Sequence, residues 1–148
     1  MSNTQEVNIL LVEDDVVDQQ GLKRALRELR LVNPLLIANN GVTALEILRS
    51  DKDALINPPY IVLLDINMPR MNGLEFLREI RADKNLRETV VFILSTSNSP
   101  DDISLAYDLN VAGYIVKSDL KNSFLEALSM LEHYWRIVEL PKKEMGAE

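Results

Sequence analysis

Five short runs rich in Ile, Val and Leu recur along the chain, and helix-period stretches alternate with them. The runs are mostly continuous rather than alternating, which is typical of parallel strands buried on both faces. They predict strands at Val7–Val12, Pro34–Ala38, Tyr60–Leu64, Val90–Leu94 and Gly113–Val116. The stretches between them predict helices at Asp15–Leu31, Gly41–Arg49, Gly73–Asp83, Pro100–Leu109 and Asp119–Leu140.

Strict alternation of strand and helix predicts an α/β fold, a doubly wound parallel sheet of five strands with helices on both faces. Each crossover should be right-handed. Asn72 and the Ser99-Pro100 pair are expected to begin two of the helices. The first helix should bury a stripe made of Val17, Leu22, Leu26 and Leu29. We expect one domain over residues 1–148, with its core at about 7–138 and a polar tail at 139–148.

Composition excludes several classes of protein. The chain is 47% hydrophobic and 26% charged, as globular proteins are. No apolar run approaches the ~20 residues of a membrane helix, and no signal peptide is evident. We therefore expect a cytoplasmic protein without a membrane partner. The absence of cysteine excludes disulfides and thiol chemistry. A net charge of −7 argues against nonspecific nucleic-acid binding, and a lone histidine, His133, argues against histidine-rich metal sites.

Acidic residues stand at the ends of two predicted strands. Glu13 and Asp14 follow the first strand, and Asp65 follows the third. In a parallel sheet the strand ends share one edge, where ligands bind at a reversal of strand order. If these strands are adjacent, the carboxylates converge, repel one another and favour a hard cation such as Mg²⁺. The alternative is that Asp14 or Asp15 caps the next helix.

Two further strand ends carry polar side chains. Ser95-Thr96-Ser97 ends the fourth predicted strand, and Lys117 ends the fifth. Either feature alone is common, because serine and threonine form turns and lysine is usually solvated. Their matching positions predict a hydroxyl and an ammonium that contact an anion attached to the acidic pocket.

Four motifs in order carry a resemblance to a known family. They are Leu10–Asp15 (LLVEDD), Leu63–Gly73 (LLDINMPRMNG), Ile93–Thr96 (ILST) and Gly113–Lys117 (GYIVK). Together they resemble the receiver domain of two-component response regulators over nearly the whole chain. The resemblance implies a flavodoxin-like strand order, 2-1-3-4-5. It also implies a phosphorylation-dependent signalling switch rather than a classical enzyme, with a sensor histidine kinase as partner and no output domain.

The resemblance assigns roles residue by residue. Asp65 matches the phosphoacceptor, which would take the phosphoryl group with Mg²⁺ as cofactor. Glu13 and Asp14 match the acidic pair that holds the metal with Asp65. Asn67 matches the position that lends its backbone carbonyl to the metal. Lys117 matches the lysine that contacts the phosphoryl group.

The same resemblance predicts how the signal spreads. Ser95 matches the switch hydroxyl, and Tyr114 matches the aromatic residue that turns inward on activation. The surface of the fourth helix, fifth strand and fifth helix would then change. The chain departs from the family at Ser118, where proline is usual. A cis bond without proline costs about 2.5–4 kcal/mol, so we expect a trans Lys117-Ser118 peptide, a shifted loop and a displaced Lys117.

Two features suggest partners. The long Ser50–Pro59 connection and the Asn67-Met-Pro run resemble single-domain regulators that serve bacterial phytochrome-type histidine kinases. The last predicted helix carries an apolar seam and would be about 30 Å long, longer than the sheet edge it covers. We therefore expect Tyr134, Trp135 and Val138 to project and form a homodimer contact.

Three rival functions are weaker. A haloacid-dehalogenase-like phosphatase needs a second aspartate where this chain has Asn67, and no cap domain fits in 148 residues. A pseudo-receiver would lack the acidic residues or the phosphoacceptor. A DNA-binding regulator would need an output domain, and only eight residues follow Leu140 in an acidic chain.

Overall fold

The protein is a five-stranded parallel sheet with strand order β2-β1-β3-β4-β5, as predicted. The computed structural model describes residues 6–50, 55–119 and 124–141. The strands are β1 (Asn8–Val12), β2 (Leu35–Ala38), β3 (Tyr60–Leu64), β4 (Val90–Ser95) and β5 (Gly113–Val116). The helices are α1 (Val16–Glu28), α2 (Gly41–Arg49), α3 (Gly73–Ala82), α4 (Pro100–Asp108) and α5 (Phe124–Ile137). A 3₁₀ turn, η1, covers Lys117–Asp119.

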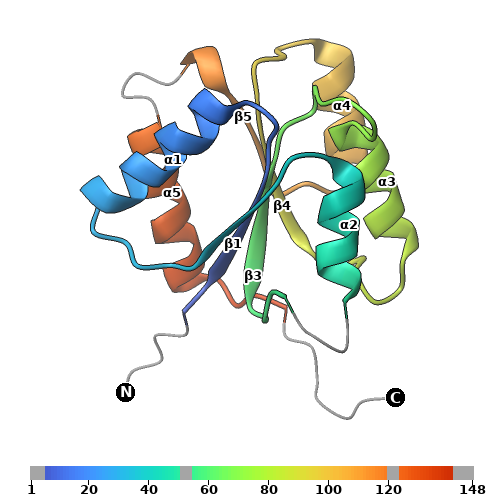
Figure 1. Cartoon of the computed structure of the whole chain (residues 1–148). Coiled ribbons are helices and arrows are strands. Elements are labelled where there is room, and N and C mark those ends of the chain that lie inside the picture. Colours follow the sequence, from blue (N-terminus) through green and yellow to red (C-terminus); the bar gives the residue numbers. More distant parts are fainter. Residues whose placement is uncertain (1–5, 51–54, 120–123, 142–148) are drawn as a thin grey trace.

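The helices form two layers, with α1 and α5 on one face of the sheet and α2, α3 and α4 on the other (Figure 1). Side chains of β1 alternate between the two layers: Ile9 and Leu11 join the cluster under α1 and α5, and Leu10 and Val12 join the opposite cluster. All four are at most 2% exposed. A strand with two buried faces has no polar face, so its sequence is a continuous apolar run.

Pairing between β1 and β3 positions the ends of both strands. Val12 lies opposite Leu64 in the parallel register. The ladder continues one residue further, because the Asp65 N–H donates to the Val12 carbonyl oxygen over 3.0 Å. On the other side of β1, the Glu13 N–H donates to the Ala38 carbonyl oxygen over 2.9 Å. Backbone pairing therefore holds Glu13 and Asp65 on adjacent strand ends.

The helix starts follow the predicted caps. Asn72 and Glu75 form a reciprocal capping box at α3, and Ser99 caps α4 ahead of Pro100. Asp15 caps α1, with its Oδ1 accepting from the Val17 N–H over 2.8 Å. The alternative reading of the acidic run is thus correct for Asp15, and Asp14 is not part of the cap.

The first turn of α1 departs from the prediction. Val17 is 77% exposed, whereas Leu22 and Leu26 are buried in the cluster with α5. The first α1 residue in that cluster is Leu22, so the apolar stripe begins after the first turn. Val17 was assigned wrongly because it precedes Leu22 by five residues, which places it about 140° around the helix from the face that Leu22 and Leu26 bury.

The last helix is shorter than predicted. α5 ends at Ile137, and Lys117–Asp119 form a 3₁₀ turn; residues 120–123 lie outside the described part of the chain. Tyr134 packs edge-on against Phe92, with ring centroids 5.0 Å apart, and Trp135 packs against the same cluster. Tyr134 follows the buried Leu131 by three positions, which places both on one helix face. The expectation that Tyr134 and Trp135 project is therefore wrong, and Val138, 37% exposed, lies past the helix end.

An arginine on α3 joins two connections that follow it in the chain. Arg81 donates four hydrogen bonds to backbone carbonyl oxygens, at distances of 2.7–3.0 Å. The acceptors are Arg87, Thr89, Leu109 and Asn110. Arg81 thus ties the connection before β4 to the connection before β5, a role that its position in a helical stretch did not predict.

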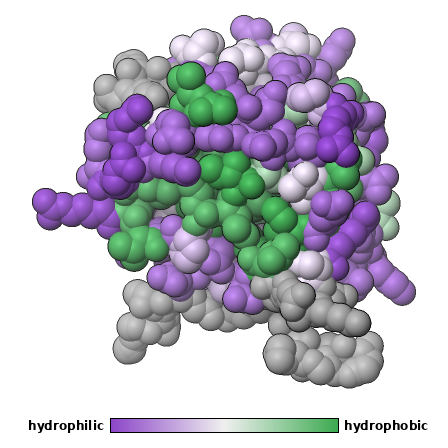
Figure 2. Space-filling model, in the orientation of Figure 1, coloured by the Kyte–Doolittle hydropathy of each residue, from purple (hydrophilic) through white to green (hydrophobic). Residues whose placement is uncertain are grey.

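One sheet edge leaves apolar side chains partly uncovered. Leu35, Leu36 and Ile37 of β2 are each half-buried. Figure 2 shows an apolar area on the face between α1 and α2, where this edge strand lies. None of the helices within the described ranges is long and apolar enough to cross a membrane.

Candidate functional site

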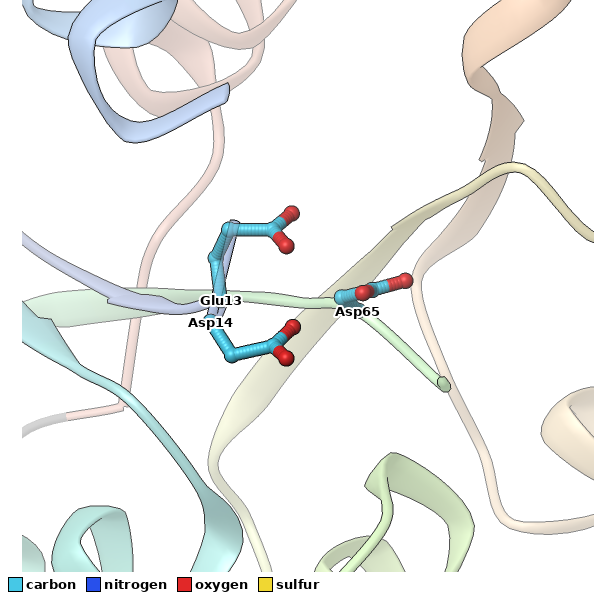
Figure 3. Close-up of side chains that lie close together, drawn as sticks. All are labelled: Glu13, Asp14 and Asp65. Carbon is cyan, nitrogen blue, oxygen red and sulfur yellow. The ribbon is translucent and has the colours of Figure 1, made fainter. Parts of the chain in front are cut away.

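Three carboxylates meet at the ends of β1 and β3. Glu13, Asp14 and Asp65 each place one oxygen within 4.8 Å of the others. Figure 3 shows the side chains of Glu13 and Asp14 extending from the end of β1 toward the side on which Asp65 lies. Glu13 and Asp65 are only 2% and 6% exposed, whereas Asp14 faces solvent. The structure therefore brings together the three acids that the adjacency of the first and third strands predicts.

Burial sets the electrostatics of this cluster. It raises the pKa of Glu13 from 4.5 to about 7, with Lys117 opposing the rise and the negative charge of Asp65 adding to it. Burial also raises the pKa of Asp65, against lowering contributions from Lys117, the Ser95 hydroxyl and the Asn67 backbone N–H. Ionising the two buried carboxylates therefore costs free energy, and the surrounding protein offsets this cost only in part.

The donor set fits a hard divalent cation. Three carboxylates face one lysine, and oxygen ligands of this kind are those that Mg²⁺ prefers. Among the residues that the structure describes, no other group of three or more His, Cys, Asp or Glu side chains is close enough to share an ion. A cation here would remove the repulsion that burial intensifies.

Lys117 reaches the acidic cluster from the end of β5. It follows β5 directly, and its Nζ lies 2.6 Å from Glu13 Oε1 and 2.6 Å from Asp18 Oδ2. Burial lowers the pKa of Lys117, but the contacts with Asp18 and Glu13 outweigh it and the pKa lies above its ordinary value. The Lys117-Ser118 peptide is trans, since the one cis bond among described residues is Pro58-Pro59. Lys117 nevertheless remains in the pocket, contrary to the expected displacement.

Asp18 was not predicted as a site residue. It lies in the first turn of α1, where an acidic residue is common at the positive end of a helix. The available signal was its spacing of four from Asp14, one helical turn. The contact with Lys117 joins residues 99 positions apart, which local spacing alone does not predict.

The predicted hydroxyl comes from Ser95 and not from its neighbour. Ser95 is fully buried and hydrogen-bonds to the Asp65 carboxylate, whereas Thr96 is exposed. Ser95 Oγ also accepts from the Ser97 N–H over 3.2 Å. Tyr114 Oη donates to the Ser97 carbonyl oxygen over 2.9 Å, so the two predicted switch residues meet through one loop residue.

Two more contacts shape the surroundings of Asp65. Ser97 Oγ donates to Asp102 Oδ2 over 2.6 Å, tying the loop after β4 to the first turn of α4. The Cβ of any other residue in place of Gly73 would lie 2.3 Å from the Asp65 carbonyl oxygen. Glycine is therefore required at this close approach of α3 to the end of β3. The Asn67 N–H bonds to the Asp65 carboxylate, while the rest of Asn67 is exposed.

Comparison with known proteins agrees with this geometry. The family described as "Response regulator receiver domain" matches residues 9–129. Response regulator Rcp1 of Synechocystis sp. is 32% identical over 135 residues, 90% of this chain and 92% of that protein. Its Mn²⁺-bound crystal structure has a TM-score of 0.77 at 31% identity, covering 91% of this chain and 99% of that one. The phosphorylated cyanobacterial phytochrome response regulator RcpA has a TM-score of 0.81 at 34% identity, covering 93% and 100%.

Proposed function

Since the chain belongs to the family of response regulator receiver domains, we propose that Asp65 accepts a phosphoryl group from a sensor histidine kinase. The observation that carries this assignment is the position of Asp65. Its carboxylate is buried, shares a pocket with two other acids, and hydrogen-bonds to Ser95. Burial makes ionisation of this carboxylate unfavourable, so a purely structural role would not explain an aspartate at this position.

In the proposed reaction an Asp65 oxygen attacks the phosphorus of a phosphohistidine. The new O–P bond converts Asp65 to an acyl phosphate. The P–N bond breaks, and its electron pair stays with the imidazole, which takes up a proton. Lys117 binds a phosphoryl oxygen, and the Asn67 N–H holds the Asp65 carboxylate in place. The attacking carboxylate must be ionised, so groups that lower the pKa of Asp65 favour the reaction.

Glu13, Asp14 and Asp65, with the Asn67 backbone carbonyl, would hold Mg²⁺. A bound Mg²⁺ supplies positive charge that neutralises the carboxylates and the oxygens of the transferring group. The Mn²⁺-bound form of the relative Rcp1 supports a divalent cation in this pocket.

The phosphoryl group would then act as a switch. It adds about −1.5 to −2 charges and new hydrogen-bond acceptors. The Ser95 hydroxyl, already beside Asp65, can donate to it, and Tyr114 follows through the Ser97 carbonyl. The population of protein conformations then shifts toward one arrangement of the α4–β5–α5 surface, to which a partner binds.

Labelling by a small acyl phosphate tests the assignment of Asp65. Wild type should gain one phosphoryl group by intact mass in Mg²⁺, and little when the metal is chelated. Asp65→Asn should gain none, whereas Asp101→Asn, a change at an exposed residue of α4, should label like wild type. Equal labelling of wild type and Asp65→Asn would exclude Asp65 as the acceptor.

We propose a phytochrome-type histidine kinase as the partner. The support is the relative RcpA, named as a phytochrome response regulator and 34% identical over 93% of this chain. Phosphoryl transfer from a panel of purified histidine kinases is the test. Transfer should be fastest from a phytochrome-type kinase, and a faster reaction with kinases of other sensor classes would contradict the assignment.

A homodimer through the end of α5 is a further part of the proposal. Ile137 is 83% exposed and Val138 is 37% exposed, and they adjoin the packed Tyr134 and Trp135. Exposed apolar residues beside aromatic ones are typical of a contact between subunits. Sedimentation with and without a phosphoryl analogue should show a dimer that Val138→Asp weakens and Val17→Asp does not. A monomer at every concentration under both conditions would refute it.

A further inference from the structure

The Lys117 ammonium is shared between a carboxylate of the acidic cluster and one outside it. Nζ lies 2.6 Å from Glu13 Oε1 and 2.6 Å from Asp18 Oδ2. The Glu13 side chain is 3% exposed, and the Asp18 side chain, on the first turn of α1, is 27% exposed. The two acceptors therefore differ in surroundings: Glu13 faces the pocket interior, and Asp18 stands at its rim.

Both oxygens of Glu13 already have partners within the protein. Oε1 accepts from Lys117 Nζ, and Oε2 accepts from the Asp15 backbone N–H over 3.1 Å. A divalent cation that binds Glu13 must come close to an oxygen that an ammonium or an amide occupies. Two cations on one carboxylate repel strongly in a site with little water. Metal binding at Glu13 therefore favours movement of the ammonium away from Oε1.

Asp18 offers the ammonium a place to go. An ammonium has three donor hydrogens on a flexible stem, so it can release one acceptor and keep another. The Lys117 side chain is only 11% exposed, and leaving the pocket entirely would cost it two ion-pair contacts. An ammonium that stays on Asp18 loses only one of these ion-pair contacts.

We propose that Asp18 is a positioning residue that retains the Lys117 ammonium when a divalent cation takes Glu13. The exchange keeps a positive charge at the rim of the pocket, where it remains available to a phosphoryl group on Asp65. The exchange rests on the metal site of the proposed function, and its last consequence rests also on the proposed phosphorylation of Asp65. The exchange itself concerns four groups: the cation, Glu13, Lys117 and Asp18.

Calorimetric titration of Mg²⁺ into a double-mutant cycle tests the exchange. Without Asp18 the ammonium depends on Glu13 alone and competes with the metal, so Asp18→Asn should weaken Mg²⁺ binding. In a Lys117→Met background no ammonium competes, and the same Asp18→Asn change should have a smaller effect. We expect the fold-loss in the wild-type background to exceed that in the Lys117→Met background by at least threefold. Equal fold-losses would overturn the proposal, because Asp18 would then act only through its own charge.

Two controls separate positioning from charge and from folding. Asp15→Asn removes one charge from the same helix end while keeping a capping side chain, and it should weaken Mg²⁺ binding equally in both backgrounds. Asp18→Glu restores a carboxylate and should bind Mg²⁺ within twofold of wild type; binding as weak as that of Asp18→Asn would count against the proposal. The titration uses no phosphodonor, so failure of Asp65 to label would refute the proposed function and leave this result readable.

Discussion

Replacing Glu13 with glutamine should stabilise the metal-free protein above neutral pH, although it removes an ion pair. Burial raises the pKa of Glu13 to about 7 in the folded state, against its ordinary value of 4.5. Between those values the folded protein binds more protons than the unfolded chain. Stability therefore falls as pH rises through this window and is lowest above it, where Glu13 is ionised in both states.

The magnitude follows from the two pKa values. A rise from 4.5 to about 7 corresponds to about 3 kcal/mol of unfolding free energy, as an order of magnitude. The Glu13 side chain is 3% exposed, so water screens little of it. Glutamine has no charge to bury and keeps one oxygen that can accept from Lys117. Its amide group cannot accept from the Asp15 N–H, so the net gain should be smaller than this figure. The raised pKa of Asp65 has the same sign, so the variant should retain part of the pH dependence.

Urea unfolding, followed by circular dichroism at about pH 5 and about pH 8, measures this effect. With metal chelated, wild type should lose about 3 kcal/mol or more of unfolding free energy between the two, and Glu13→Gln clearly less. Excess Mg²⁺ should restore the unfolding free energy of wild type at the higher pH, because the cation neutralises the carboxylates. Glu88→Gln, at an exposed position, should behave as wild type. A wild-type protein equally stable at both pH values without metal would refute the reasoning.

Three further predictions concern packing and the switch. Arg81→Met removes four hydrogen bonds to backbone carbonyls and should cost about 2–4 kcal/mol in urea unfolding; a loss below 1 kcal/mol, on the order of a single neutral bond, would contradict that role. Gly73→Ala would place a Cβ 2.3 Å from the backbone and should lower the melting temperature strongly. Gly113→Ala should lower it far less, because the nearest atoms there belong to a side chain 3.1 Å away. Equal melting temperatures for the two variants would disprove the close approach at Gly73. Tyr114→Phe removes the hydroxyl bonded to the loop after β4 and should lower the free energy of unfolding by about 1 kcal/mol. Calorimetry should show an unaltered Mg²⁺ affinity. A loss of Mg²⁺ affinity of similar size would show instead that the hydroxyl supports the pocket.

Much of the site could be read from residues at strand ends. Asp65 and Lys117 each follow a continuous apolar run, and that local pattern indicates both the strand and its end. Choosing Ser95 over Thr96 was harder from the sequence, because both are hydroxyl residues at the end of one strand. The structure separates them by burial: Ser95 is fully buried beside Asp65, and Thr96 is exposed.

The errors came from the same local pattern. Val17 is apolar and lies in the first turn of α1, yet it is 77% exposed, and Trp135 fits a helical apolar repeat but packs against the core instead of projecting. A periodic repeat identifies one face of a helix but not how far along the helix the neighbouring layer extends. That extent depends on where the helix lies against the sheet.

The sequence by itself determined the order of strands and helices, the caps, and the acidic residues at the strand ends, because these depend on interactions between near neighbours. The adjacency of β1 and β3 followed from the family resemblance and not from the residue pattern. Tertiary structure alone decided that burial raises the pKa of Glu13 to about 7 and that Lys117 bonds to Asp18, 99 positions away. Burial and ion pairing between distant residues arise only when the layers pack. Short-range patterns contain no information on which distant side chains then share a pocket.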